Sequence, residues 1–89
     1  MLEKKITIIN KLGLHARAAA KLVTCATAFD SDIWLRRDSK KVNGKSILGV
    51  MMLAAGKDAR LTLIADGDDE DEAIRQLTAL ILARFDEEE

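Results

Sequence analysis

Strand-like and helix-like hydrophobic patterns follow one another along this chain in the order β-α-β-β-α-β-α. Residues 4–9 (KKITII) are rich in β-branched side chains and predict a strand. Residues 31–37 (SDIWLRR) alternate, with Ile33 and Leu35 on one face, and a turn at residues 38–39 leads into residues 40–42 (KKV). These two segments predict a hairpin. Residues 59–65 (ARLTLIA) alternate in the same way and predict a further strand before the turn DGD.

The segments between these strands have helical spacing. Residues 16–29 place apolar side chains on one helical face, at Ala19, Leu22, Val23, Ala26 and Phe29. Residues 43–56 (NGKSILGVMMLAAG) predict a short helix with Ser46 as its N-cap and Gly56 as its stop. A long C-terminal helix with an acidic first turn is predicted from the apolar stripe Ala73, Ile74, Leu77, Leu80, Ile81 and Phe85.

This order predicts an antiparallel sheet covered on one side by helices, which is an open-faced sandwich of the α+β class. The chain has 89 residues, which suffices for one hydrophobic core but leaves no room for a second. It contains no proline, no repeat and no linker-like segment. We therefore expect residues 1–89 to form a single domain.

Composition and charge exclude several classes of function. The formal net charge is −1, so the chain lacks the basic excess that nucleic-acid binding usually shows, and we expect no nucleic-acid partner. Cys25 is the single cysteine, so we expect neither an internal disulfide nor a metal site. No signal-peptide-like or membrane-spanning run is visible, and the expected location is the cytoplasm without membrane insertion. The acidic runs DGDDEDE and DEEE are expected to be solvated surface.

His15 is the single histidine and follows Gly13 at the junction between the first strand and the first helix. Glycine permits a sharp turn there, which leaves His15 at or next to the helix N-cap, where backbone N–H groups lack partners within the helix. Arg17 falls in the same first turn, where a cation is unfavourable against the helix dipole. Free N–H donors, the positive helix end and a guanidinium together predict a site for an anion.

Several chemical roles fit this position. A ring nitrogen of His15 could accept a phosphoryl group, whose roughly two negative charges the helix end and Arg17 would hold. A general base fits nearly as well, and an ordinary packed histidine is the simplest alternative. Serine-hydrolase chemistry lacks a G-x-S-x-G turn. A phosphate-binding P-loop ending at NGKS is excluded because Ser39 stands where its first glycine belongs.

The motif GLHARAAA at residues 13–20 resembles that of the HPr family, the histidine-containing phosphocarriers of the bacterial phosphotransferase system. The order of elements and the segment NGKSILGVMML are similar over the whole length. The resemblance implies an open-faced β-sandwich of HPr type, a four-stranded antiparallel sheet with three helices on one face. The alanine-rich HARAAAK and the tail RFDEEE are similar to the nitrogen-branch (NPr-like) carriers. Ala18 stands where many members have proline, and it retains an N–H that proline lacks.

The resemblance also implies a role for particular residues. His15 would be phosphorylated at Nδ1 by an Enzyme I-type donor and would pass the group to an enzyme IIA-type acceptor, with Arg17 stabilising the phosphoryl group. The chain would be a monomeric phosphoryl carrier, a phosphotransferase component rather than an autonomous enzyme, and would need no cofactor or metal of its own. The alternative function is a regulatory module whose partner binding depends on its phosphorylation state.

The second helix carries two further predictions from the resemblance. Ser46 matches a serine that a regulatory kinase modifies in some bacteria, but its preference for the N-cap position explains the residue without regulation. Ile47, Leu48 and Met51 match an apolar patch that docks partner proteins. The simpler expectation is that most apolar residues of this short helix belong to the core.

Overall fold

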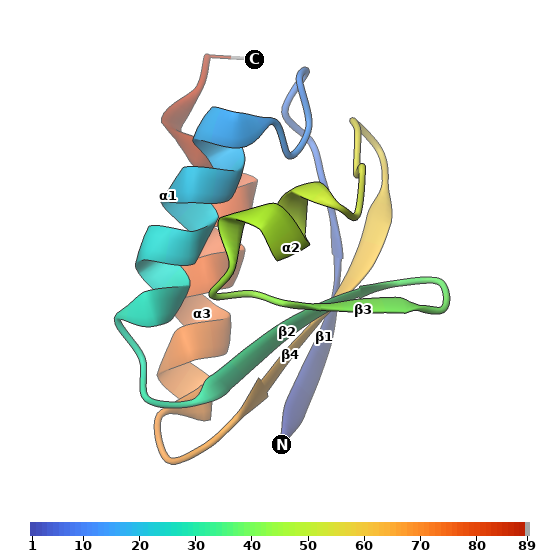
Figure 1. The fold of residues 1–89 in the computed structure, drawn as a ribbon. Helices are drawn as coiled ribbons and strands as arrows, with labels where there is room; N and C mark the ends of the chain where they lie inside the picture. Colours follow the sequence, from blue (N-terminus) through green and yellow to red (C-terminus); the bar gives the residue numbers. More distant parts are fainter. Residues whose placement is uncertain (89) are drawn as a thin grey trace.

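The structure is a computed structural model that describes residues 1–88, in which helices cover one face of an antiparallel sheet (Figure 1). The strands form one sheet in the order β1-β4-β2-β3, with bounds β1 (Leu2–Thr7), β2 (Asp32–Arg37), β3 (Lys40–Asn43) and β4 (Arg60–Asp66). The helices are α1 (Ala16–Thr27), α2 (Ile47–Met51) and α3 (Glu70–Leu82), and a short 3-10 turn, η1 (Arg84–Asp86), follows α3. The predicted α+β fold and its element order are confirmed.

The core lies between the sheet and the helices. Ile33 and Leu35 of β2 lie across from Ala65 and Leu63 of β4 and are buried, as the alternating pattern predicts. The apolar stripe predicted for α1 is buried from Ala19 through Ala26, and Phe29 is buried just beyond the helix. Full burial of one such leucine or isoleucine contributes about 1.5–3 kcal/mol.

Several element boundaries differ from the predictions by one or two residues. β1 lies two residues earlier than residues 4–9, because its ladder with β4 ends at the pair Thr7 and Arg60. Ile8 continues with backbone hydrogen bonds to Asp58 and Ala59, outside the regular ladder. β4 is shifted by one residue, and α1 ends at Thr27 rather than at residue 29.

The prediction that α2 continues to Gly56 is wrong. The helix ends at Met51, and Ala54, not Gly56, has a left-handed backbone with φ of 50°. The carbonyl oxygens that this early end leaves free accept hydrogen bonds from the β2–β3 hairpin. Arg37 Nη1 donates to Leu53 O and Ala54 O at 3.0 and 2.9 Å, and Lys40 Nζ donates to Met52 O at 3.0 Å.

The prediction of one long C-terminal helix that includes Phe85 is also wrong. α3 ends at Leu82, and the next turn places Arg84, Phe85 and Asp86 at positive φ, between 53° and 63°. This left-handed turn still buries the Phe85 side chain completely. It also redirects the chain after Asp86, so the tail does not continue along the axis of α3 (Figure 1).

Candidate functional site

A tight turn between β1 and α1 fixes the start of α1. Gly13 has φ of 67°, and a Cβ atom there would lie 2.5 Å from Ala55 O, so both backbone conformation and space require glycine. Leu14 N donates to the same carbonyl at 2.8 Å. Asn10, whose side chain is fully buried, closes the turn by donating from Nδ2 to Gly13 O at 2.8 Å.

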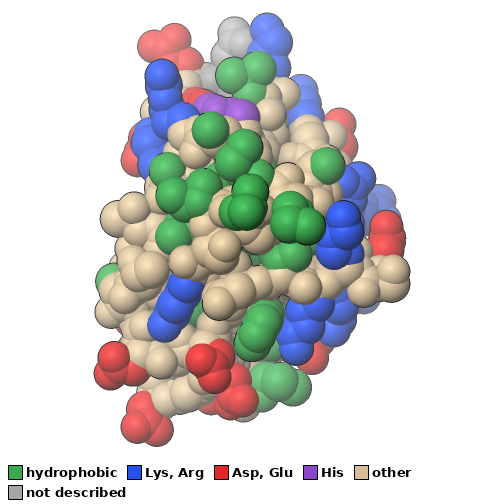
Figure 2. All heavy atoms as spheres, in the orientation of Figure 1, with side chains coloured by type: hydrophobic (Ala, Val, Ile, Leu, Met, Phe, Trp, Pro, Cys, Tyr) green, Lys and Arg blue, Asp and Glu red, His purple; other side chains and the backbone are tan. Residues whose placement is uncertain are grey.

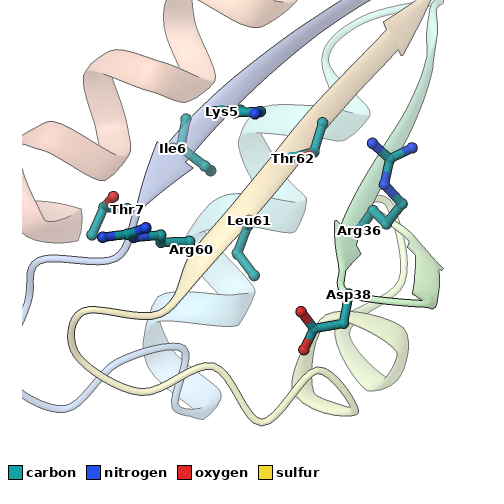
Figure 3. Close-up of a pocket in the computed structure, with 8 residues that line it drawn as sticks. All are labelled: Lys5, Ile6, Thr7, Arg36, Asp38, Arg60, Leu61 and Thr62. Carbon is teal, nitrogen blue, oxygen red and sulfur yellow. The ribbon is translucent and has the colours of Figure 1, made fainter.

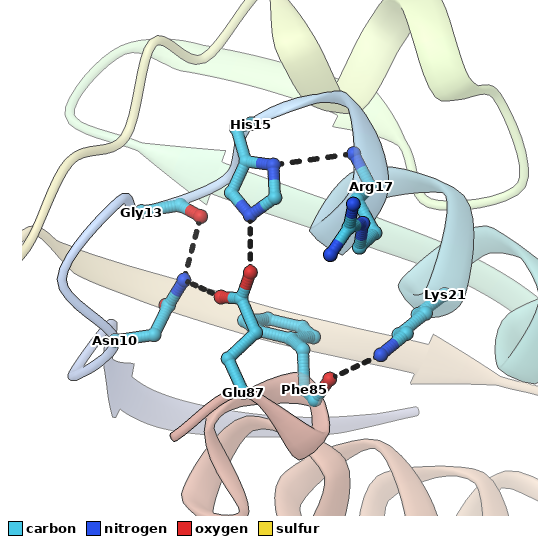
Figure 4. Close-up of polar contacts among 7 residues, drawn as sticks. All are labelled: Asn10, Gly13, His15, Arg17, Lys21, Phe85 and Glu87. Carbon is cyan, nitrogen blue, oxygen red and sulfur yellow. Dashed lines mark hydrogen bonds and ion pairs between the residues drawn. The ribbon is translucent and has the colours of Figure 1, made fainter. Parts of the chain in front are cut away.

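His15 is the N-cap of α1, as predicted. Its backbone is extended, and its carbonyl accepts from Ala19 N at 2.8 Å. Its Nδ1 atom accepts from Arg17 N at 3.3 Å, which is long for an N–H···N bond and therefore easily replaced. The side chain is 27% exposed, so one edge of the imidazole is open to a partner. The Nδ1 atom thus faces the Arg17 N–H in the first turn of α1 (Figure 4).

The tail after α3 passes beside this imidazole. Lys21 of α1 donates from Nζ to Phe85 O at 2.7 Å and holds the left-handed turn against α1. Glu87 follows, and its Oε2 atom lies 2.6 Å from His15 Nε2. Its other oxygen, Oε1, accepts from Asn10 Nδ2 at 2.8 Å. One carboxylate therefore bridges the β1–α1 turn and the imidazole (Figure 4).

The surroundings of Glu87 keep its carboxyl group ionised. Burial by itself would raise the pKa of Glu87, but hydrogen bonds from His15 and Asn10 lower it, as do charge interactions with His15 and Lys21. The net result is a pKa below the usual value for glutamate. The expectation that the whole DEEE run is solvated surface is therefore wrong for Glu87, whose side chain is only 15% exposed.

The guanidinium of Arg17 is exposed in the first turn of α1. Within residues 1–88 it makes no hydrogen bond or ion pair. α1 has no acidic residue in its first turn either, so no side chain there offsets the positive helix end. The start of α1 therefore carries a cation, the Arg17 guanidinium, together with backbone N–H groups and the Nδ1 atom of His15. It can hold an anion on the Nδ1 side of the imidazole.

The predicted apolar patch is exposed. Ile47, Leu48 and Met51 are 45%, 72% and 40% exposed, whereas Val50 and Leu53 are buried. The expectation that most apolar residues of this helix belong to the core is wrong, since Met52 is also exposed. Figure 2 shows hydrophobic side chains gathered over α2, on the face that carries the histidine. In addition, Leu12 of the β1–α1 turn is 66% exposed.

Ser46 is the N-cap of α2, as predicted, and its Oγ accepts from Gly49 N at 3.1 Å. Among residues 1–88, no hydrogen bond connects Ser46 to His15 or Arg17. Its structural role is accounted for by the cap. Its phosphorylation stays a prediction.

Other parts of the molecule are weaker candidates for a functional site. A hollow of about 410 Å³ over β1, β4 and β2 is lined by Lys5, Arg36 and Arg60 (Figure 3), but Asp38 also lines it and Arg36 pairs with Glu3 at 3.4 Å. Burial raises the pKa of the Cys25 thiol, which packs against the core. Within residues 1–88 no cluster of histidine, cysteine and acidic side chains could hold a metal, and no helix is long and apolar enough to cross a membrane.

Sequence reasoning placed His15 and Arg17 together but missed Asn10 and Glu87. Asn10 reads as the residue that ends the first strand, and Glu87 is one of several acidic residues in a polar tail. No local sequence signal identifies them, because the tail is held next to α1 by the burial of Phe85 and the bond from Lys21, which are tertiary contacts. His15 therefore has two side-chain neighbours, Glu87 directly and Asn10 through Glu87, that the sequence analysis did not assign to the site.

The sequence and the fold are similar to those of known phosphocarriers. Residues 2–83 match the family model described as the PTS HPr component phosphorylation site. A relative from Neisseria meningitidis serogroup A, "Phosphocarrier protein HPr", is 53% identical with full coverage of both chains. "Phosphocarrier protein NPr" of Shewanella violacea is 46% identical over 97% of this chain and 94% of its own. The crystal structure of HPr-C-His from Thermoanaerobacter tengcongensis superposes with a TM-score of 0.96 at 50% identity, with full coverage of both chains.

Proposed function

The chain belongs to the HPr family of phosphocarriers of the bacterial phosphotransferase system, and we propose that His15 is its phosphoryl acceptor. The observation that carries this proposal is the position of Nδ1 over the N-terminus of α1, within reach of the Arg17 N–H. A phosphoryl group on Nδ1 would replace the long 3.3 Å bond to Arg17 N, and that N–H would then donate to a phosphoryl oxygen.

The proposed reaction is an in-line displacement between two histidines. The lone pair of His15 Nδ1 forms a bond to phosphorus of an Enzyme I-type phosphohistidine, and the donor's N–P bond breaks, returning its electron pair to the donor imidazole. The reverse displacement passes the group to an enzyme IIA-type acceptor. Positioning by the partners supplies most of the catalysis, so this chain is their protein substrate rather than an autonomous enzyme.

Arg17 is proposed to stabilise the transferred group. Its guanidinium has no competing partner in the part of the chain that the structure describes, so it can turn toward an anion on Nδ1 without breaking an ion pair. Ile47, Leu48 and Met51 are proposed to dock both partners, since their exposed side chains form an apolar surface on the same face as His15.

The assay for this function combines the full chain with an Enzyme I-type donor, magnesium and phosphoenolpyruvate. We expect an acid-labile, base-stable phosphoryl adduct that disappears in His15→Ala. Arg17→Ala should slow transfer on the order of tenfold to a hundredfold, because one charged donor to the transferred group is lost. Arg60→Ala, which removes the same charge from β4, is the matched control. An adduct that survives His15→Ala, or equal rates in the two arginine variants, would refute these roles.

A regulatory module is the second candidate, and the exposed α2 patch would serve it as well. Such a module would bind partners differently in its two phosphorylation states while passing little phosphate onward. Comparing transfer flux to an acceptor with the affinity of both states for it separates the two functions. The proposal further places the chain in the cytoplasm as a monomer, and light scattering of the purified protein tests the latter.

A further inference from the structure

Asn10 and Glu87 connect the imidazole of His15 to the β1–α1 turn. The two oxygens of the Glu87 carboxylate each make one hydrogen bond, one to Asn10 and one to His15. Asn10 Nδ2 donates to Glu87 Oε1 at 2.8 Å, and His15 Nε2 lies 2.6 Å from Glu87 Oε2. The orientation of the Asn10 amide is determined, because both groups that its Nδ2 contacts, Gly13 O and Glu87 Oε1, are acceptors.

The partners of the two ring nitrogens determine where the imidazole proton lies. An ionised carboxylate can only accept a hydrogen bond, so His15 Nε2 must donate to Glu87. A backbone N–H can only donate, so His15 Nδ1 must accept from Arg17 N. Both contacts select the same tautomer, with the proton on Nε2 and a lone pair on Nδ1.

From this geometry we propose that Asn10 and Glu87 are positioning residues that hold His15 in the Nε2–H tautomer and so present Nδ1 as the nucleophile. The inference rests on the proposed function of His15 and names the residues that prepare it. Glu87 acts through the hydrogen bond to Nε2, and Asn10 acts through Glu87 by fixing the position of its carboxylate.

The tautomer matters because it lets phosphoryl transfer proceed without a proton shift. When Nδ1 forms its bond to phosphorus, the proton stays on Nε2 and the ring gains a positive charge, which the Glu87 carboxylate opposes at 2.6 Å. When the N–P bond breaks, the electron pair returns to Nδ1 and the Nε2–H···Glu87 bond is unchanged. The opposite tautomer would have to lose its Nδ1 proton before attack.

The tautomer can be measured on the full chain without any phosphorylation. Long-range ¹H–¹⁵N correlation spectra of histidine distinguish Nδ1–H from Nε2–H in the neutral ring, and they are recorded at a pH at which no imidazolium signal remains. We expect the Nε2–H form to predominate in the wild-type protein. Loss of one charge-assisted hydrogen bond should shift the ratio of the tautomers by about tenfold.

The variant pair is designed so that Glu88 cannot replace Glu87. Glu88→Ala serves as the reference, since Glu88 is exposed and none of the hydrogen bonds described for His15 and Asn10 involves it, and Glu87→Ala is then added to it. The double variant should have a ratio of Nε2–H to Nδ1–H about tenfold smaller than that of the reference, and the Arg17 N–H contact still favours Nε2–H. Glu87→Gln should restore part of the ratio because the amide oxygen still accepts. Asn10→Ala should shift the ratio in the same direction, and a melting curve shows whether it folds.

The result that overturns the proposal is an Nδ1–H tautomer in the wild-type protein, or an unchanged tautomer ratio in the Glu87 double variant. Failure of the proposed function has a different signature. If His15→Ala still accepts phosphate while the tautomer ratio responds to Glu87, the carrier role of His15 fails alone. If phosphorylation requires His15 but its tautomer ignores Glu87, the positioning role fails alone.

Discussion

The start of α1 and the start of α2 are both capped by a side chain, yet the two caps differ in quality. Ser46 is among the preferred N-cap residues, and its hydroxyl accepts from Gly49 N at 3.1 Å. Histidine is not among them, and His15 Nδ1 accepts from Arg17 N at 3.3 Å. The cap of α2 is explained by stability alone. The cap of α1 places a reactive nitrogen where a better helix cap could stand.

Gly13 in the turn into α1 and Gly56 in the loop after α2 should differ most in their tolerance of substitution. Gly13→Ala combines a φ of 67° with a Cβ contact of 2.5 Å to Ala55 O, and we expect it to lower the free energy of unfolding by about 2–4 kcal/mol. Gly56→Ala is the control, because a Cβ there meets nothing within 4 Å. Urea unfolding measures both variants. Equal stability of the two would show that the β1–α1 turn is not constrained as described.

An asparagine precedes each cap, and removing each one extends the comparison. Asn10→Ala leaves the buried Gly13 carbonyl without its donor and should cost about 1–3 kcal/mol of unfolding free energy. Asn43, which accepts from Lys45 N at 2.8 Å, is exposed, so Asn43→Ala should cost about 1 kcal/mol or less. Thermal or denaturant unfolding shows which of the two variants loses more unfolding free energy. A larger loss from Asn43→Ala would contradict the importance of the buried turn.

Replacing each cap residue shows whether it contributes to stability. Ser46→Ala should lower the free energy of unfolding by about 1 kcal/mol, because the Gly49 N–H loses its acceptor. His15→Ser should cost less than this, since serine supplies a better cap while the Glu87 contact is lost. Chemical unfolding of the two variants under identical conditions makes the test. A greater loss from His15→Ser would contradict this account, because the imidazole with its Glu87 contact would then stabilise the fold more than a serine cap does.

The start of α3 provides a third case with the smallest expected effect. Asp69 is the N-cap residue but makes no cap bond, and its carboxylate instead accepts from the Ser31 hydroxyl and the Asp30 and Ser31 N–H groups. The Ser31 hydroxyl, followed by the Asp30 N–H, holds the pKa of Asp69 below its usual value.

The lowered pKa of Asp69 predicts acid destabilisation. The unfolded chain then binds a proton more readily than the folded one, so the contribution of Asp69 is full above the usual carboxyl pKa of about 4 and is lost as pH falls through the lower folded pKa. Asp69→Asn should flatten the decline in unfolding free energy below about pH 4. An identical pH dependence in the variant would exclude this role.

Local sequence signals predicted the elements and both helix starts, because the hydrophobic period, Gly13 and Ser46 act through their near neighbours. The end of α2 could not be predicted in this way. It depends on Arg37 and Lys40, which reach its last carbonyl groups from another part of the chain.

The contact between Glu87 and His15 could not be predicted from the sequence for a related reason. It depends on three successive residues at positive φ, Arg84 to Asp86, none of which is glycine. Burial of Phe85 and the bond from Lys21 hold that conformation, and both are tertiary contacts. A periodic apolar pattern therefore extended the predicted helix through a turn that in fact directs the tail to His15.

The position of the phosphoryl group on the imidazole is the sharpest test of how the start of α1 works. The full chain is phosphorylated with phosphoenolpyruvate, magnesium and an Enzyme I-type donor, and ³¹P and ¹⁵N spectra identify the bonded nitrogen. We predict phosphorus on Nδ1 of His15 with the proton retained on Nε2, because Glu87 occupies the Nε2 side at 2.6 Å. Phosphorus on Nε2, or on any residue other than His15, would contradict this account.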